Sequence, residues 1–196
     1  MFKKYDLAVI LTLLVLVICS LVVACIIRNY GIPETVLAEA IASIEVIEVA
    51  KPYIEPQLEY YDIPLSYELQ EYTQTVCQQY NVPLELALAV MAKESSYQVD
   101  AVNGKSYGLM QIHEINFSRL SDKLSITDFN NPQNNILAGV YMLSELTAKY
   151  DDLHKVLMAY NHGEAGAKKL WREAIYSTDY SNKVLDTYKL LKQEVE

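Results

Sequence analysis

The stretch PLELALAVMAKESSY, residues 83–97, decides how the rest of this sequence is interpreted. It opens with a proline, which suits the first turn of a helix, and continues with good helix formers that are mostly apolar. On a helix of about 3.6 residues per turn, Glu94 lies on the side of Val90 and half a turn away from Glu85. Burial and the negative end of the helix dipole both raise the pKa of a carboxyl group there. Because a general acid needs a raised pKa near neutral pH, Glu94 is a candidate catalytic residue.

Glu94 also has a structural interpretation, in which its carboxylate reaches solvent or pairs with the neighbouring Lys93. Two further clusters of polar residues favour a functional site instead. They are GLMQ at 108–111, which follows a glycine-flanked loop, and AYNHG at 159–163. Their amide and phenol groups suit the hydroxyl and N-acetyl groups of a sugar.

Helical patterns dominate the chain from Ser66 to its end, and no stretch alternates convincingly with a period of two. Ser66 and Asn131 are helix-capping residues, and Pro132 follows Asn131 at a first helical position. The predicted helices begin at Ser66, Pro83, Pro132, Leu153, Glu164 and Tyr180. We therefore expect an all-α globular domain over residues 66–196, large enough for a hydrophobic core.

The N-terminal end carries a separate signal. Residues 7–27 contain no charged side chain and are long enough for a helix across a bilayer. Lysines 3 and 4 precede this run, so the positive-inside rule places residues 1–6 in the cytoplasm and the chain beyond residue 28 outside the cell membrane. We expect a single-pass, uncleaved anchor. The alternative is a lipoprotein, because Val-Val-Ala-Cys at 22–25 resembles a bacterial lipobox that would lipidate Cys25.

Residues 28–65 read as an acidic extracytoplasmic linker. Nine acidic residues and one lysine lie between positions 29 and 75, and four prolines are scattered among them. Residues 36–50 have the spacing of a short amphipathic helix, whereas a self-repelling spacer is an equally good interpretation. In either case this segment separates the helical domain from the bilayer.

Composition excludes several classes of function. A net charge of −9 argues against nucleic acid as a partner, because phosphate contacts need a basic face. Cys77 is the only cysteine outside the predicted membrane segment, so the domain has no internal disulfide. Its three histidines (His113, His154 and His162) lack the spacing of metal ligands, and no phosphate-binding glycine loop is present. We expect neither a metal nor a cofactor, and no motif names a protein partner.

The three polar clusters together resemble the catalytic domain of the soluble-lytic-transglycosylase type, which is similar to goose lysozyme. The family pattern is E-S-x-aromatic, G-L-M-Q and A-Y-N-x-G, and it stands here as ESSY at 94–97, GLMQ at 108–111 and AYNHG at 159–163. The sequences at 131–143 and 180–185 are also similar to family helices. This resemblance implies a lysozyme-like α-fold whose groove binds the glycan strand of peptidoglycan.

The resemblance also implies a mechanism and a set of site residues. Glu94 would protonate the glycosidic oxygen between N-acetylmuramic acid and N-acetylglucosamine, and then accept the proton of the muramyl C6 hydroxyl. That hydroxyl would attack C1, giving a 1,6-anhydro end without adding water. Tyr160 would orient Glu94. The implied substrate-binding residues are Ser95, Asn103, Gln111, Tyr160 and Asn161. Asn103 stands where family members often have serine, which leaves substrate preference open.

Two alternatives remain at this point. One is a muramidase-type hydrolase on the same fold, which needs a second carboxylate roughly 5–9.5 Å from the first. The next acids along the chain, Asp100, Glu114 and Asp128, are better interpreted as solvated loop residues. The other alternative is a non-catalytic cell-wall-binding scaffold within a secretion or conjugation machine.

Overall fold

The computed structural model describes residue 58 and residues 60–193 of the 196-residue chain. The chain divides into two units after Pro56, and every described residue belongs to the second unit. The predicted membrane segment, residues 7–27, and most of the predicted linker, residues 28–65, lie outside the described residues. Within the described part, no helix is both long and apolar enough to cross a bilayer.

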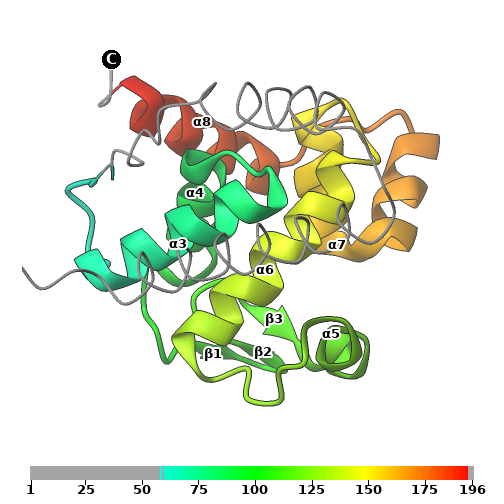
Figure 1. Cartoon of the computed structure of the whole chain (residues 1–196). Helices are drawn as coiled ribbons and strands as arrows, with labels where there is room; N and C mark the ends of the chain where they lie inside the picture. The colour runs from blue at the N-terminus through cyan, green and yellow to red at the C-terminus, as the bar shows by residue number, and fades with distance from the viewer. Residues whose placement is uncertain (1–57, 59, 194–196) are drawn as a thin grey trace, which may run out of the picture. The chain divides into compact units, whose positions relative to one another are not determined.

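Helices make up most of this second unit (Figure 1). The α-helices are α3 (Tyr67–Tyr80), α4 (Leu84–Ser95), α5 (Phe117–Leu124), α6 (Pro132–Thr147), α7 (Leu153–Arg172) and α8 (Asp179–Gln193). A short 3-10 helix, η1 (Glu114–Asn116), leads into α5. The predicted helices are confirmed within a residue or two at most boundaries, whereas η1 and α5 were not predicted.

Capping chemistry explains where two of these helices begin. The Ser66 hydroxyl accepts a hydrogen bond from the backbone N–H of Leu69, 3.4 Å away, at the start of α3. The Asn131 side chain accepts from two backbone N–H groups in the first turn of α6, at 3.0 and 3.1 Å. Pro132 follows at a position whose N–H would have no helical partner. Both starts are therefore determined within one turn of chain.

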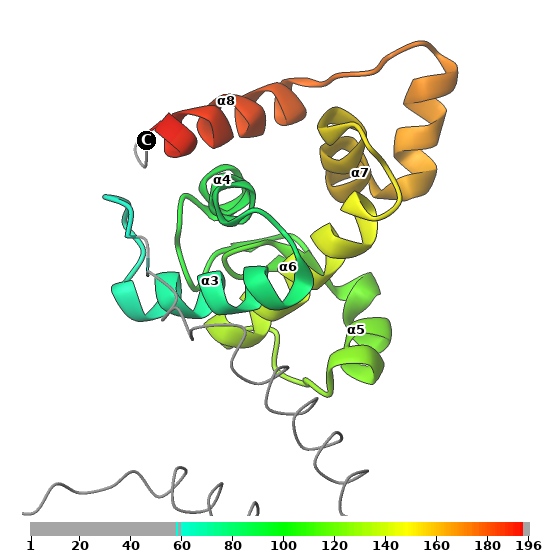
Figure 2. The ribbon, with the colours of Figure 1, turned by 45° about the horizontal axis from the view of Figure 1, so that its top comes forward.

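Helix α4 lies at the centre of the domain. Its residues from Leu86 to Met91 have no exposed surface at all. The helix packs against α3, α6 and α8, and Figure 2 shows it between α3 and α8. A helix that is apolar around its whole circumference is stable only when neighbours cover it on every side. Side chains at the C-terminal end of α4 therefore lie in a largely apolar environment.

The prediction of an all-α domain is wrong in one detail, because the described part also contains a small sheet. Its strands are β1 (Val102–Asn103), β2 (Ser106–Tyr107) and β3 (Ile112–His113), paired antiparallel in that order. Figure 1 shows the sheet beside α5. Each strand has only two residues, which is too short for alternation of apolar and polar side chains to be visible in the sequence. The described part is therefore mostly helical, with one small antiparallel sheet.

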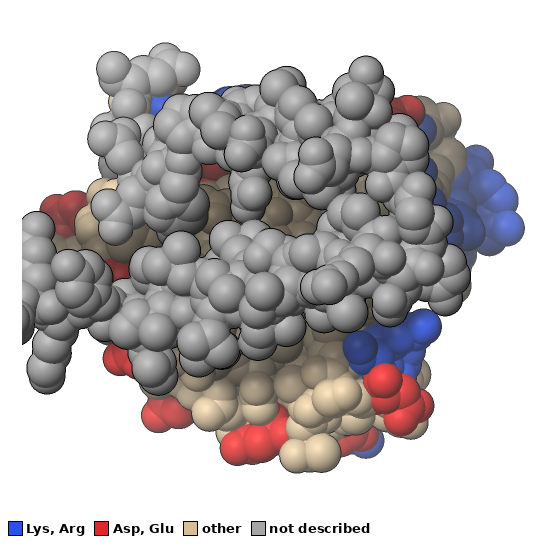
Figure 3. Space-filling model, in the orientation of Figure 1, with Lys and Arg blue, Asp and Glu red and all other residues tan. Residues whose placement is uncertain are grey.

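Charged side chains of both signs are interspersed on the described surface (Figure 3). On the face shown, basic side chains gather toward the side where the C-terminal half of α7 lies. That half carries Lys168, Lys169 and Arg172, all of them exposed.

Candidate active site

Glu94 is the penultimate residue of α4 and is half-buried. Burial raises the pKa of its carboxyl group, while a hydrogen bond from Tyr180 and the charge of Lys93 oppose that shift. The predicted direction is therefore confirmed, and its leading cause is desolvation. Lys93 itself points over the ring of Tyr180, with its Nζ 5.9 Å from the ring centroid. The carboxyl group thus occupies an apolar setting with one phenol donor.

Tyr180 is the residue that orients this carboxyl group. Its hydroxyl donates to Glu94 Oε1 across 2.6 Å, from the first turn of α8. The role of orienting Glu94 was expected from Tyr160; in the structure Tyr180 makes this hydrogen bond, and the role of Tyr160 stays a prediction. The Tyr160 hydroxyl donates instead to the carbonyl oxygen of Met110, at 2.9 Å. Tyr160 remains close to the site, since burial and the charge of Glu94 raise its pKa well above the usual value.

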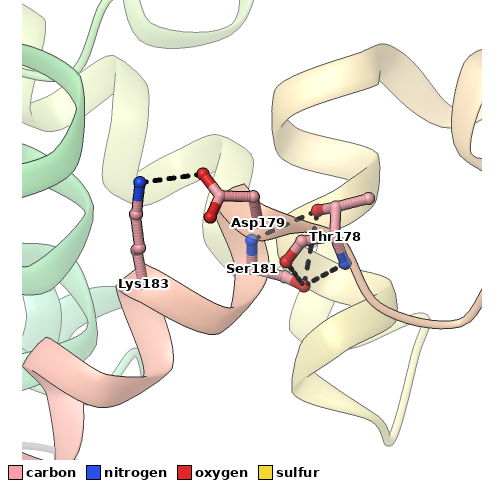
Figure 4. Close-up of polar contacts among 4 residues, drawn as sticks. All are labelled: Thr178, Asp179, Ser181 and Lys183. Atoms are coloured by element: carbon pink, nitrogen blue, oxygen red, sulfur yellow. Dashed lines mark hydrogen bonds and ion pairs between the residues drawn. The ribbon is translucent and has the colours of Figure 1, made fainter.

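A half-buried network fixes the start of α8, the helix that carries Tyr180; Figure 4 shows its contacts between Thr178 and Ser181. The backbone N–H of Thr178 donates to Ser181 Oγ at 2.9 Å, and the backbone N–H of Ser181 donates to Thr178 Oγ1 at 3.2 Å. This reciprocal arrangement is a capping box. His154 on α7 adds a contact of 2.9 Å between its Nδ1 and Ser181 Oγ. Because Ser181 is fully buried, the network fixes the turn that aims Tyr180 at Glu94.

The side-chain amide of Asn135 on α6 makes three hydrogen bonds in and beside the GLMQ loop. Its Oδ1 accepts from the Met110 backbone N–H at 2.8 Å, and its Nδ2 donates to the carbonyl oxygens of Tyr107 and Phe129 at 2.7 and 3.0 Å. Gly108 has a φ of +74°, and a Cβ atom there would lie 2.4 Å from the Asn135 amide nitrogen. Only glycine combines that dihedral angle with so close an approach.

Gln111 follows this loop with a left-handed backbone, at φ +48°. Its Nε2 donates to the carbonyl oxygens of Ala101 and Gly108, at 3.1 and 2.9 Å. Its Oε1 is buried and has no hydrogen-bond partner within the described residues. A buried acceptor without a donor is costly, so this oxygen is suited to accept from a ligand. The predicted binding role of Gln111 is therefore chemically possible through its carbonyl oxygen.

Two other predicted substrate-binding residues lie in different surroundings. Ser95 is buried, and its hydroxyl lies 3.1 Å from the Met91 carbonyl oxygen and 2.9 Å from that of Leu109. The Ser95 hydroxyl therefore joins α4 to the GLMQ loop, and the expected contact of Ser95 with substrate stays a prediction. Asn103 is exposed on β1, where it pairs with Ser106.

A cleft of about 870 Å³ is lined by residues of α5, α6 and α7. We call it the α5–α7 cleft; its walls include residues 159–164 of α7, His113, Arg119 of α5, Glu145 of α6, and Lys149 just after α6. The structure thus brings two predicted residues, Tyr160 and Asn161, into its wall. Ser95, Asn103 and Gln111 do not line it.

Helix α7 bends where it forms this wall. Gly163 has φ +67° and ψ 157°, which interrupts the helix between the two helices predicted from the sequence. A φ in that range is unfavourable for residues with a Cβ atom, which explains a glycine at the end of AYNHG. Asn161 and His162 consequently lie exposed at the bend.

The family expected from the ESSY, GLMQ and AYNHG motifs agrees with a comparison of the chain against models of known protein families. The model of the transglycosylase SLT domain matches residues 71–183, which is more than half of the chain. The chain belongs to the transglycosylase SLT domain family. Among curated protein sequences, none matches it.

Two solved structures share the fold of this SLT domain. An inactive mutant of the lytic transglycosylase Slt from Pseudomonas aeruginosa matches 70% of this chain with a TM-score of 0.57 and 20% sequence identity. The 70 kDa soluble lytic transglycosylase from Escherichia coli matches 64% with a TM-score of 0.54 and 20% identity. This chain spans only about a quarter of their lengths, 26% and 24%.

Proposed function

We propose that this SLT-family chain is a peptidoglycan lytic transglycosylase, anchored in the cell membrane by residues 7–27. The observation that carries the proposal is the setting of Glu94, a half-buried carboxyl with a raised pKa that accepts a hydrogen bond from Tyr180. A carboxyl group in that setting is protonated at a higher pH than a solvated one and can act as a general acid.

The proposed reaction uses one carboxyl group twice. Glu94 donates its proton to the glycosidic oxygen as the bond from that oxygen to muramyl C1 breaks. The C6 hydroxyl oxygen then bonds to C1, and its proton returns to the Glu94 carboxylate. Glu94 ends protonated, no water is consumed, and the product is a 1,6-anhydromuramyl end. The Tyr180 hydroxyl stabilises the carboxylate that exists between the two proton transfers.

The two carboxylates of the α5–α7 cleft, Glu145 and Glu164, are both engaged by cations, which supports a mechanism with one carboxyl group. Glu145 accepts from Arg119 at 2.6 Å, and Glu164 pairs with Lys149 at 2.5 Å. A retaining or inverting hydrolase needs a second carboxylate that acts as a nucleophile or activates water. Carboxylates engaged by a cation are poorly suited to either role, because the cation withdraws the electron density that such a step requires.

The experiment that tests this function is mass spectrometry of the fragments released from purified peptidoglycan by the full chain in detergent. We expect anhydromuramyl ends with the wild type and none with Glu94→Gln. The matched control is Glu173→Gln, the same substitution at the exposed residue that directly follows α7. Fragments with reducing ends, one water heavier, would instead make the protein a hydrolase. Equal release by Glu94→Gln and wild type would overturn the assignment of Glu94.

The proposed anchor is tested separately, by the membrane fractionation of a Cys25→Ser variant. An uncleaved helix keeps this variant in the membrane with the mass of the full chain, because the apolar run of residues 7–27 is unchanged. A lipoprotein depends on Cys25, so the same variant would lose its lipid and accumulate as an unprocessed precursor. Release of the wild-type chain into the soluble fraction would contradict both forms of anchoring.

A further inference from the structure

His154 is the one histidine of this chain that does not line the α5–α7 cleft. It lies in the first turn of α7 and is half-buried. Its Nδ1 is 2.9 Å from the hydroxyl oxygen of Ser181 on the neighbouring helix α8. Ser181 has no exposed surface, and buried polar side chains need a hydrogen-bond partner within the protein. The imidazole of His154 is therefore a partner for a group that water does not reach.

The hydrogen bonds at the start of α8 are of two kinds. Thr178 and Ser181 bond to one another within one turn, in the reciprocal pattern that Figure 4 shows. Bonds of that kind decide where a helix begins, but they do not place it in the domain, because both partners move with the helix. His154 belongs to a different helix. Its contact with Ser181 therefore also fixes where the first turn of α8 lies against α7.

The residue before Ser181 is Tyr180, whose hydroxyl donates to Glu94 Oε1 across 2.6 Å. Two hydrogen bonds thus tie the same turn of α8 to other helices, one to α7 and one to α4. A displacement of about 1 Å is enough to break so short a bond to the carboxyl group. Whatever holds this turn in place therefore also preserves the contact between Tyr180 and Glu94.

We propose that His154 is a positioning residue for Glu94, which holds the first turn of α8, through Ser181, where the Tyr180 hydroxyl meets the carboxyl group. The inference rests on the proposed function, in which Glu94 is both the acid and the base. It adds a residue on a third helix that contacts neither Glu94 nor the glycan and still affects the proton transfers. The catalytic carboxyl group then depends on a path of three side chains, from α7 through α8 to α4.

The groups around Glu94 determine what the loss of His154 should change. Burial raises the pKa of Glu94, whereas the bond from Tyr180 and the charge of Lys93 lower it. Tyr160 of α7 is the other titratable group at this carboxyl, and the charge of Glu94 helps to raise the pKa of Tyr160. His154 is not among the causes that act on the pKa of Glu94 directly. Displacing Tyr180 removes one of the two influences that favour the anion, so the pKa of Glu94 should rise.

A double-mutant cycle tests this path in the full chain in detergent. His154→Leu removes both ring nitrogens and should lower kcat for glycan cleavage about fivefold with KM unchanged, the size of one neutral hydrogen bond. In a Tyr180→Phe background the same substitution should have no further effect, because its route to Glu94 is already lost. His154→Asn should keep a kcat close to that of the wild type. Its amide places a donor or an acceptor the same number of bonds from the backbone as Nδ1.

A second measurement reports on Glu94 without any turnover. NMR titration of the labelled glutamate carboxyl carbons gives the pKa of Glu94, whose signal is the one missing from Glu94→Gln. This pKa should rise in His154→Leu and in Tyr180→Phe, and it should be unchanged in His154→Asn. Thr187→Val is the matched control, because it removes a hydrogen bond of 3.1 Å from the same helix, to the Lys183 carbonyl, beyond the first turn. It should change neither the pKa nor kcat.

Three outcomes would overturn the inference. The first is a further fivefold loss of kcat when His154→Leu is added to Tyr180→Phe, because His154 would then act by another route. The second is an unchanged pKa of Glu94 in His154→Leu. The third is a loss in Thr187→Val as large as that in His154→Leu, which would indicate a general loosening of α8. Absence of cleavage by the wild-type chain would contradict the proposed function instead, and the titration would still decide whether His154 positions the partner of Glu94.

Discussion

Glu94 and Glu164 are two carboxyl groups of one domain with opposite electrostatic environments. Each accepts a hydrogen bond from a tyrosine, Glu94 from Tyr180 at 2.6 Å and Glu164 from Tyr150 at 2.5 Å. Yet the pKa of Glu94 is raised, chiefly by burial, and that of Glu164 is lowered, chiefly by its bond to Lys149.

The comparison shows that the tyrosine does not decide the protonation state. A phenol donor favours the carboxylate in both places. What differs is that Glu94 ends a buried helix, whereas Glu164 lies at the cleft wall beside a lysine. Loss of water around a carboxyl group outweighs one hydrogen bond to its anion. The same kind of side chain therefore has a raised pKa at the first position and a lowered pKa at the second.

The largest expected effect is a difference in the rate of glycan cleavage between variants of the two carboxyl groups. Glu94→Gln removes the proton donor and should lower the rate of glycan cleavage by about 10²–10⁴-fold. Glu164→Gln removes an ion-pair partner and should lower it by less than about tenfold. Release of soluble fragments from peptidoglycan measures both. Similar losses in the two variants would mean that Glu94 has no special role.

A smaller effect is expected when the tyrosine donors are removed one at a time. Tyr180→Phe deletes the bond that favours the Glu94 carboxylate, so the pKa of Glu94 should rise further. The rate should fall roughly tenfold at neutral pH, the size of one hydrogen bond to a charged group. The alkaline limb of the pH profile of kcat/KM should also move to higher pH, because Glu94 stays protonated longer. Tyr150→Phe is the control and should leave that limb in place; a shared shift would contradict the comparison.

The half-buried network behind Tyr180 should matter to stability as well as to activity. Ser181→Ala removes the side-chain partner of Thr178 and of His154 in a position without solvent access. Leaving such groups unpaired should lower the free energy of unfolding by about 1–3 kcal/mol. Urea denaturation measures the loss. Ser118→Ala, at an exposed residue of α5, is the matched control. Equal stability of the two variants would show that the network does not stabilise α8.

The smallest effect is a dependence of stability on pH with opposite sign at the two carboxyl groups. Because the pKa of Glu94 is raised by folding, its contribution to stability is fully present below the unfolded pKa and is lost as pH rises through the folded pKa. Glu94→Gln should therefore raise Tm by a few degrees at neutral pH and by less in acid.

Because the pKa of Glu164 is lowered, its contribution to stability is present above the unfolded pKa and is lost as pH falls through the folded pKa. Glu164→Gln should lower Tm slightly at neutral pH, since solvent screens an exposed pair. A rise in Tm for both variants would contradict the comparison.

Local chemistry made much of the fold predictable. Ser66, Asn131 and Pro132 each act within one turn of chain, so the helix starts that they predict agree with the structure. The raised pKa of Glu94 was also predictable, because the residues before it form an uninterrupted apolar helix. The strands were not, since two residues are too few to show a period.

By itself, the sequence determined the helices, their caps, the family motifs and the identity of the candidate acid, because each of these depends on residues close together in the chain. Only the tertiary structure decided which tyrosine serves Glu94, since Tyr180 lies 86 residues away and no local pattern marks the pair. It also decided that Ser95 joins two elements inside the domain. Contacts between distant segments depend on how the helices pack, and packing is a property of the whole domain that no single motif contains.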